Sequence, residues 1–131
     1  MIVPDTSVWV DFLRGTSSPE AERLKLLISR VPLLVGDLIL CEILQGVPTE
    51  RQAREVEAAL RAFDVVPMVG DGVATAAAAH FRTLRAQGTT VRKTIDLLIG
   101  AFCIRHGHIL LHRDRDFDPM TRHLGLKVLP V

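Results

Sequence analysis

The chain has 131 residues, of which 48% are hydrophobic, and its formal net charge is +1. This length and apolar content predict a single domain over residues 1–131 that buries its own core, and they exclude a disordered chain. The charge neither requires nor excludes a nucleic-acid partner, the apolar runs are too short to span a bilayer, and no signal peptide opens the sequence, so a cytoplasmic protein is expected.

Short apolar strands alternate with helices in the first half of the sequence. The pattern predicts, in chain order, a strand at Met1–Pro4, a helix through Val8–Leu13 capped by Thr6 or Ser7, a helix over 18–29 that a capping box at Ser17 and Glu20 starts, a strand at Pro32–Val35 and a largely apolar helix at Asp37–Gly46.

The same alternation continues to the end of the chain. It predicts a polar helix at Glu50–Phe63 with a capping box at Thr49 and Gln52, a strand at Val65–Val69, an alanine-rich helix at Asp71–Gln87, an apolar helix that Thr94 caps and that ends at Arg105, a strand at Ile109–Leu111, a short helix at Phe117–His123 and a strand at Lys127–Leu129. Short apolar strands separated by helices favour an α/β fold, in which a mostly parallel sheet has helices on both faces.

Acidic residues lie inside or directly against four of the apolar runs. They are Asp5, Glu42, Asp96 and the pair Asp114 and Asp116. A carboxylate beside buried hydrocarbon costs free energy unless it has a partner, and a divalent cation such as Mg²⁺ is a partner that several carboxylates can share. Asp5 and the Asp114–Asp116 pair each follow a strand, so we expect them at the carboxyl edge of the sheet, where ligands bind in such folds.

Most of these acids also have a simpler interpretation. Asp5 can cap the next helix, Asp96 suits the first turn of its helix, where the helix dipole favours negative charge, and Asp114 and Asp116 can be turn residues paired with arginines. Glu42 is the hardest to explain in this way, because nearly all of its neighbours are apolar and no basic residue lies within one helical turn of it. A shared metal site explains all five residues at once.

Four basic residues lie close in sequence to these acids, namely Arg92, Lys93, Arg113 and Arg115. They are candidates for holding the phosphates of a polyanionic substrate, and the alternative is local charge balance.

A zinc site at His108 and His112 lacks an evident third ligand. Cys41 and Cys103 are expected to be small buried hydrophobic residues in a reducing compartment.

Four short segments carry a family resemblance. They are Asp5–Arg14, Leu40–Gly46, Thr94–Ala101 and His112–Phe117, and they follow one another in this order over essentially the whole chain. Together they resemble the motifs of PIN-domain ribonucleases, specifically the VapC-type toxins of bacterial toxin–antitoxin pairs. One departure is His112, which stands where many relatives carry Thr or Ser and so leaves no hydroxyl at that position.

The resemblance implies a fold, an activity and partners. It implies a PIN-like three-layer α/β/α sandwich and an endoribonuclease that depends on Mg²⁺, with Mn²⁺ as a substitute. It also implies a homodimer and inhibition by a VapB-type antitoxin. By motif matching, Asp5 and Asp96 become the central metal ligands, Asp114 and Asp116 become further ligands, and Glu42 becomes a ligand or a water-positioning group.

Two other classes of function and two surfaces stay open. A small-molecule phosphatase with an aspartyl nucleophile would need a second Asp where Ser7 stands, and a catalytically weak PIN-like module would bind RNA or a partner without cutting it. The alanine-rich helix at 73–81 is either a dimer face or packed inside the domain. Helices 18–29 and 37–46 are expected to form a groove for an antitoxin helix.

Overall fold

The computed structural model describes all residues from 1 to 131, and in it strands and helices alternate along the chain. The strands are β1 Ile2–Pro4, β2 Leu34–Gly36, β3 Asp64–Val66, β4 Ile109–Leu111 and β5 Lys127–Val128. The helices are α1 Thr6–Arg14, α2 Pro19–Leu27, α3 Asp37–Gln45, α4 Glu50–Leu60, α5 Gly70–Ala86, α6 Thr94–His106 and α7 Asp118–Leu124, with a 3₁₀ turn, η1, at Arg115–Phe117.

All strand pairs are parallel, as the sequence predicts. β1, β4 and β5 form one ladder in that order, and β2 pairs with β3 in a second ladder. A parallel bridge between Ile2 and Leu33 joins the two ladders, so the strands follow the spatial order β3, β2, β1, β4, β5. The chain therefore moves outward from β1 on one side and then returns to the other side of β1, which makes the β1–β4 border the switch point of the sheet.

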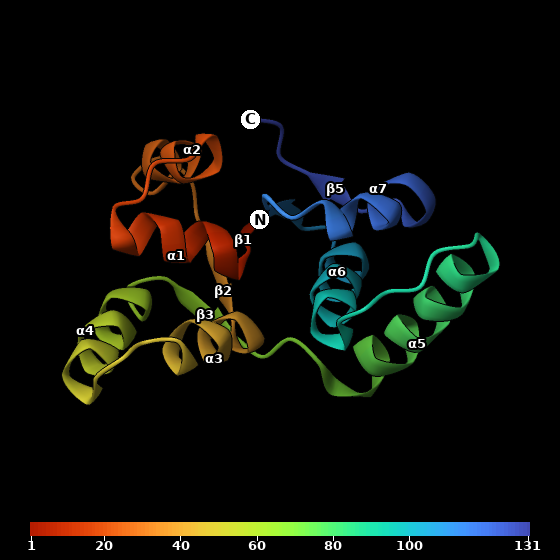
Figure 1. Cartoon of the computed structure of the whole chain (residues 1–131), viewed down its shortest axis with the longest axis horizontal. Helices are drawn as coiled ribbons and strands as arrows, with labels where there is room; N and C mark the ends of the chain where they lie inside the picture. The colour runs from red at the N-terminus through yellow and green to blue at the C-terminus, as the bar shows by residue number, and fades with distance from the viewer.

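The helices lie in two layers. Figure 1 shows α1 to α4 gathered on one side of the strands and α5 to α7 on the other. Right-handed crossovers require this arrangement, because the connections before β3 run in one direction along the sheet and the later ones run in the opposite direction. The three-layer sandwich predicted from the sequence is thus confirmed. No helix of the structure combines the length and the apolar character needed to cross a membrane.

The core lies between the sheet and both helix layers. The strand residues Val3, Val35 and Leu110 are completely buried, which explains why the strands are continuously apolar rather than alternating. Trp9 of α1 is also completely buried, and its ring packs against Phe63 at a centroid distance of 5.1 Å. This packing holds α1 against the segment that joins α4 to β3.

Three predicted helix caps are wrong by one or two residues. The residue before α1 is Asp5, and Thr6 and Ser7 lie inside the first turn. α2 is capped by Ser18 instead of Ser17, and the Ser18 hydroxyl accepts a hydrogen bond from the Ala21 amide at 3.0 Å. Thr94 is the first residue of α6 and does not cap it. Sequence spacing alone does not separate adjacent Ser and Thr residues, because each can accept the same amide bond.

Other predictions about single elements have mixed outcomes. The capping box at Thr49 is confirmed, since its hydroxyl accepts from the Gln52 amide at 3.2 Å. The predicted helix over 117–123 is in fact the turn η1 followed by α7. The second strand is shifted by one or two residues, and the third begins one residue earlier and ends three residues earlier than predicted. Cys103 is buried as expected, but Cys41 is exposed, because it faces away from the sheet on α3.

Candidate active site

Asp5 lies at the switch point of the sheet. Its backbone amide donates to the Leu111 carbonyl at 2.8 Å, which extends the β1–β4 ladder by one bond and places Asp5 beside the end of β4. The residue is only 6% exposed, and its carboxylate accepts a hydrogen bond from the Ser7 hydroxyl at 3.2 Å. Burial is the main reason that the pKa of Asp5 is raised to about 6; hydrogen bonds from Thr6 and Ser7 act against it, and the negative charges of Glu42 and Asp114 act with it.

Asp96 occupies the first turn of α6 and is also 6% exposed. Burial raises the pKa of its carboxyl group to about 6, and the charge of Asp5 is the next largest cause. Asp114 and Glu42 act in the same direction, while Lys93 opposes them. The two buried aspartates and the two other acids therefore lie close enough to repel one another, although they come from four separate parts of the sequence.

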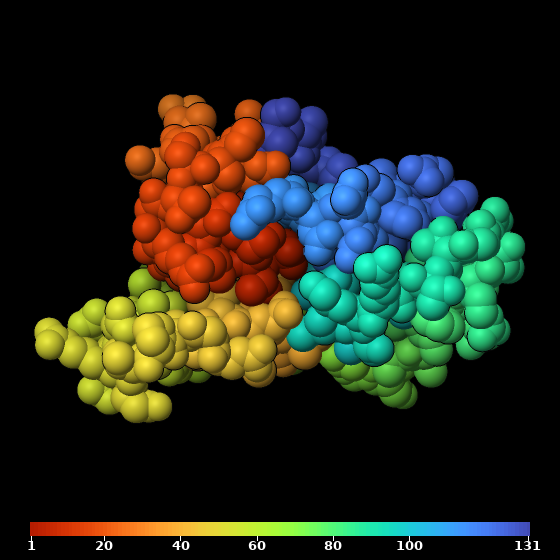
Figure 2. Space-filling model, in the orientation of Figure 1, coloured from red at the N-terminus to blue at the C-terminus, as the bar shows by residue number.

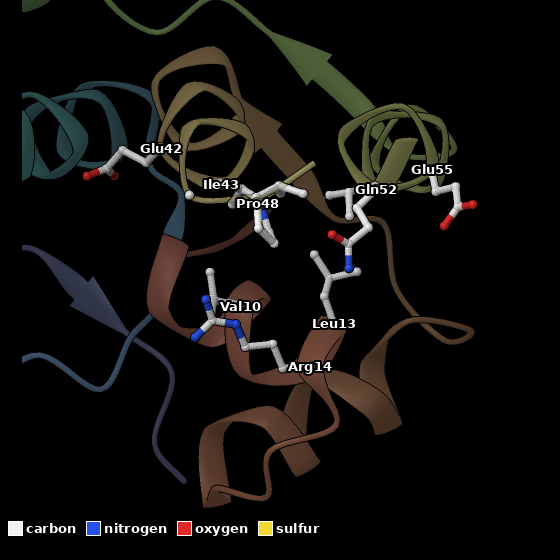
Figure 3. Close-up of a pocket in the computed structure, with 11 residues that line it drawn as sticks. Val10, Leu13, Arg14, Glu42, Ile43, Pro48, Gln52 and Glu55 are labelled. Carbon is white, nitrogen blue, oxygen red and sulfur yellow. The ribbon is translucent and has the colours of Figure 1, made fainter. Parts of the chain in front are cut away.

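Glu42 is half-buried on α3 rather than enclosed in hydrocarbon. The Thr6 hydroxyl donates to its Oε1 at 2.6 Å, so the partner that its apolar neighbours could not provide comes from α1. Figure 3 shows that the Glu42 carboxylate points away from Gln52 and Glu55, out of the groove beside it. The bond to Thr6 fixes this orientation.

Asp114 and Asp116 lie in the segment between β4 and η1. The Asp114 carboxylate accepts from the Asp116 amide at 2.9 Å and caps the 3₁₀ turn, so the simpler interpretation as a turn residue is also correct for Asp114. Asp96, Asp114 and Asp116 each offer a carboxylate oxygen, and these oxygens lie within 4.8 Å of one another. Tertiary structure thus brings an acid from α6 to the two acids that follow β4.

Asp96, Asp114 and Asp116, together with Asp5 and Glu42, whose charges interact with theirs, are called the acid cluster below. The acid cluster fits a hard divalent cation. All of its donors are carboxylate oxygens, the ligand type that Mg²⁺ prefers, and their mutual repulsion is what a bound cation would relieve. Ion pairs within the protein do not relieve it, because the three ion pairs of the structure involve none of these five acids. In Figure 2 the surfaces of α1, α3, α6 and the segment after β4 meet near the middle of one face.

Two polar cavities adjoin the cluster and contain all four predicted basic residues. A cavity of about 390 Å³ is lined by Arg92, Lys93 and Arg115 together with Asp96 and Asp116. A second cavity, of about 370 Å³, is lined by Ser7, Arg113, Asp114 and Arg115. Arg115 lies on both cavities.

Sequence reasoning missed Asp11, whose carboxylate is bonded to Arg113. Asp11 is 6% exposed, and the Nε atom of Arg113 lies 2.8 Å from its Oδ2. A signal was present, because Asp11 follows Val8 by three residues and so shares the buried face of α1. The sequence prediction also missed the hydrogen bond from Thr6 to Glu42. A Thr at a helix start can cap its own helix or donate to a neighbouring one, and the sequence does not distinguish the two.

His112 supports the turn instead of supplying a hydroxyl group. Its Nδ1 atom accepts a hydrogen bond from the Asp114 amide at 3.1 Å, and its ring packs on Phe117 at 4.9 Å. Burial lowers the pKa of His112, which favours the neutral ring that this bond requires. His112 therefore helps to hold Asp114 in place.

An apolar groove of about 320 Å³ begins beside Glu42 and runs between α1, α3 and α4. Figure 3 shows Val10, Leu13 and Arg14 on one wall and Ile43 and Pro48 on the other. The groove does not lie between α2 and α3 as expected, because α1 packs against both helices and separates them (Figure 1).

The alanine-rich helix α5 packs mainly on α6. Val73, Ala77 and Leu84 are buried, and Phe81 is half-buried. This face therefore serves packing within the domain.

The chain is similar to known proteins over nearly its whole length. The model of the PIN domain family matches residues 2–122. VapC ribonuclease Mb1587 of Mycobacterium bovis and ribonuclease VapC11 of Mycobacterium tuberculosis are each 35% identical to the chain over 130 residues, which cover 97% of this chain and 96% of the relative. Two solved structures have a similar fold. They are VapBC2 from Rickettsia felis bound to a promoter DNA fragment, with TM-score 0.76, 18% identity and 98% of both chains covered, and VapBC-1 from Haemophilus influenzae, with TM-score 0.75, 20% identity and 98% and 97% covered.

Proposed function

The chain belongs to the PIN-domain family and, at 35% identity over nearly its whole length, to the VapC ribonucleases within it, and from that premise we propose that it is an endoribonuclease that hydrolyses RNA phosphodiesters as the toxin of a toxin–antitoxin pair. The observation that supports this function best is the set of five acids at the switch point of the sheet. Two of them, Asp5 and Asp96, are buried although neither forms an ion pair.

Mg²⁺ is the proposed cofactor, with Mn²⁺ as a substitute. Asp96, Asp114 and Asp116, whose carboxylate oxygens lie within 4.8 Å of one another, would hold it together with Asp5, whose charge interacts with those of Asp96 and Asp114. When bound, such a cation polarises a phosphoryl oxygen and lowers the pKa of a coordinated water.

The remaining residues have distinct tasks in the proposed reaction. Thr6 occupies Oε1 of Glu42, which leaves Oε2 to orient the attacking water and to accept its proton. Arg92, Lys93 and Arg115 line the cavity next to Asp96 and Asp116, where they would bind the phosphates that flank the scissile bond.

The proposed partner is a VapB-type antitoxin, and the proposed assembly is a homodimer in the cytoplasm. The groove between α1, α3 and α4 suits an amphipathic segment of the antitoxin, because Val10, Leu13 and Ile43 line it and Glu42 lies at its end. A segment bound there would pass directly beside the acid cluster, so one partner would both bind the groove and cover the site.

A cleavage assay tests the proposed activity. The purified protein is incubated with a panel of structured RNAs in the presence of Mg²⁺ or Mn²⁺, with EDTA as the control. We expect cleavage only with metal, and a loss of about 100-fold or more in Asp5→Asn and Asp96→Asn, since each removes a central ligand. Unchanged cleavage by these variants would refute the assignment, and RNA binding without products would favour the binding-module alternative.

A further inference from the structure

Asp11 and Arg113 form an ion pair between parts of the chain that are 102 residues apart. The guanidinium lies side-on to the carboxylate, with Nε at 2.8 Å from Oδ2 and Nη2 at 3.3 Å from Oδ1. Nη2 donates a hydrogen bond to Oδ1, and Nε forms a close ion-pair contact with Oδ2, so both carboxylate oxygens hold the guanidinium in place. The pair therefore ties α1 to the segment that follows β4.

The Asp11–Arg113 ion pair lies directly beside the acid cluster in the sequence. Arg113 immediately precedes Asp114, whose amide is bonded to His112 and whose carboxylate accepts the Asp116 amide. The position of Arg113 therefore affects Asp114 through one peptide unit, and Asp116 through the bond between the two aspartates. No β-ladder pairs residues 112–116, so side-chain bonds of this kind must define the path of the segment.

Burial makes the pair persistent. The Asp11 side chain is 9% exposed and the Arg113 side chain 46%, so Asp11 is the member that cannot be solvated if the pair breaks. Arg115 differs from Arg113, because it forms no ion pair and lies on both cavities. The two arginines, two residues apart, thus have different surroundings.

We propose that Asp11 is a positioning residue that acts through Arg113 to hold Asp114 and Asp116 in the arrangement that binds the metal. This inference rests on the proposed function. It assigns Arg113 to the scaffold of the site and leaves Arg115 as the arginine of this segment that binds a substrate phosphate.

Charge-neutralising variants distinguish positioning from simple electrostatics. If the pair acted only through its charges, Asp11→Asn would remove a negative charge and weaken metal binding, whereas Arg113→Gln would remove a positive charge and strengthen it. If the pair positions the segment, both variants loosen the same two acids and both weaken metal binding. The sign of the Arg113→Gln effect is therefore decisive.

The experiment measures Mn²⁺ affinity by isothermal titration calorimetry without RNA, in the full-length protein. We expect Asp11→Asn and Arg113→Gln each to weaken Mn²⁺ binding about tenfold, which is the lower end of the effect of removing a residue that supports metal ligands. The double variant should be no weaker than the weaker single variant, because both changes break one interaction. Arg113→Lys keeps one bond to Asp11 and should give an intermediate affinity.

Arg115→Gln is the matched control, since it removes the same charge two residues away without touching Asp11. It should raise KM for RNA and leave Mn²⁺ affinity equal or tighter. Ser18→Ala lowers stability by removing the cap of α2, without removing a hydrogen bond or ion pair of residues 112–116. It should leave Mn²⁺ affinity unchanged, which separates positioning from general destabilisation.

Tighter or unchanged Mn²⁺ binding in Arg113→Gln would overturn the proposal, as would additive losses in the double variant. If wild type and Asp96→Asn bound Mn²⁺ equally, the metal site of the proposed function would fail instead.

Discussion

Asp5 and Asp96 are the two acids predicted from the sequence that are also buried and have raised pKa values. Both residues are 6% exposed, and burial is the main reason that the pKa of each is raised to about 6 from the ordinary value of 3.8. Each residue has a simpler role as well, since Asp5 precedes α1 and Asp96 lies in the first turn of α6. A residue at a helix start does not need to be buried. The burial of these two carboxylates is favourable when a bound cation compensates their charge.

The raised pKa values predict how the stability of the metal-free protein depends on pH. Between about pH 4 and pH 6 the folded protein binds more protons at Asp5 and Asp96 than the unfolded chain does. Their contribution to stability is therefore fully present below about pH 4 and is lost as pH rises through about 6. A cation that binds the ionised carboxylates offsets this loss.

Millimolar Mg²⁺ should accordingly raise the thermal midpoint of the wild type more at about pH 7.5 than at about pH 5. Differential scanning fluorimetry with and without EDTA measures the shift. Asp96→Asn is the control, and its shift should be much smaller at both pH values. An equal shift in wild type and variant would mean that the metal binds elsewhere.

Thr6 illustrates what residue-by-residue reading misses. Spacing identified it as a possible cap, yet its hydroxyl donates to Glu42 on another helix at 2.6 Å. The bond exists only because α1 packs against α3. A polar residue at a helix start can serve its own backbone or a neighbouring helix, and only the packing decides between them.

At the level of elements, the starts of α3 and α4 were predicted to the residue, and those of the other helices to within one or two residues. Thr49 was located correctly, but Ser18 caps α2 where Ser17 was expected. Pro19 explains the difference, because proline is favoured at the first helical position and the cap is then the residue before it.

Ser18→Ala should destabilise the protein by about 1 kcal/mol, because it removes the acceptor for the Ala21 amide. For a domain of this size the thermal midpoint should fall by roughly 3–5 °C. Ser17→Ala is the matched control and should have no measurable effect, since Ser17 is exposed and lies outside the helix. Equal effects of the two substitutions would show that the cap is shared.

At the level of the whole molecule, the order of the layers decides where a partner can bind. α1 lies between α2 and α3 (Figure 1), so the apolar groove opens between α1, α3 and α4. The groove and the acid cluster share Glu42, so a partner bound in the groove would also lie beside the site.

Val47→Glu should abolish co-purification with the proposed VapB-type antitoxin, because it adds a charge to the groove. Leu26→Glu is the control, since Leu26 lies on α2 and is 58% exposed. Both variants should still cleave RNA. Loss of co-purification in Leu26→Glu alone would place the partner on α2, where the sequence had suggested it.

The sequence by itself determined the alternation of strands and helices, the parallel three-layer fold and the five acids, because apolar periodicity and acids beside apolar runs are local patterns. Tertiary structure decided which polar groups meet. The Thr6–Glu42 bond, the Asp11–Arg113 pair and the position of the groove all join segments from different helices or loops. Such contacts depend on how helices cross and pack, and the free energy that fixes the packing is spread over the whole core, so no single stretch of sequence encodes it.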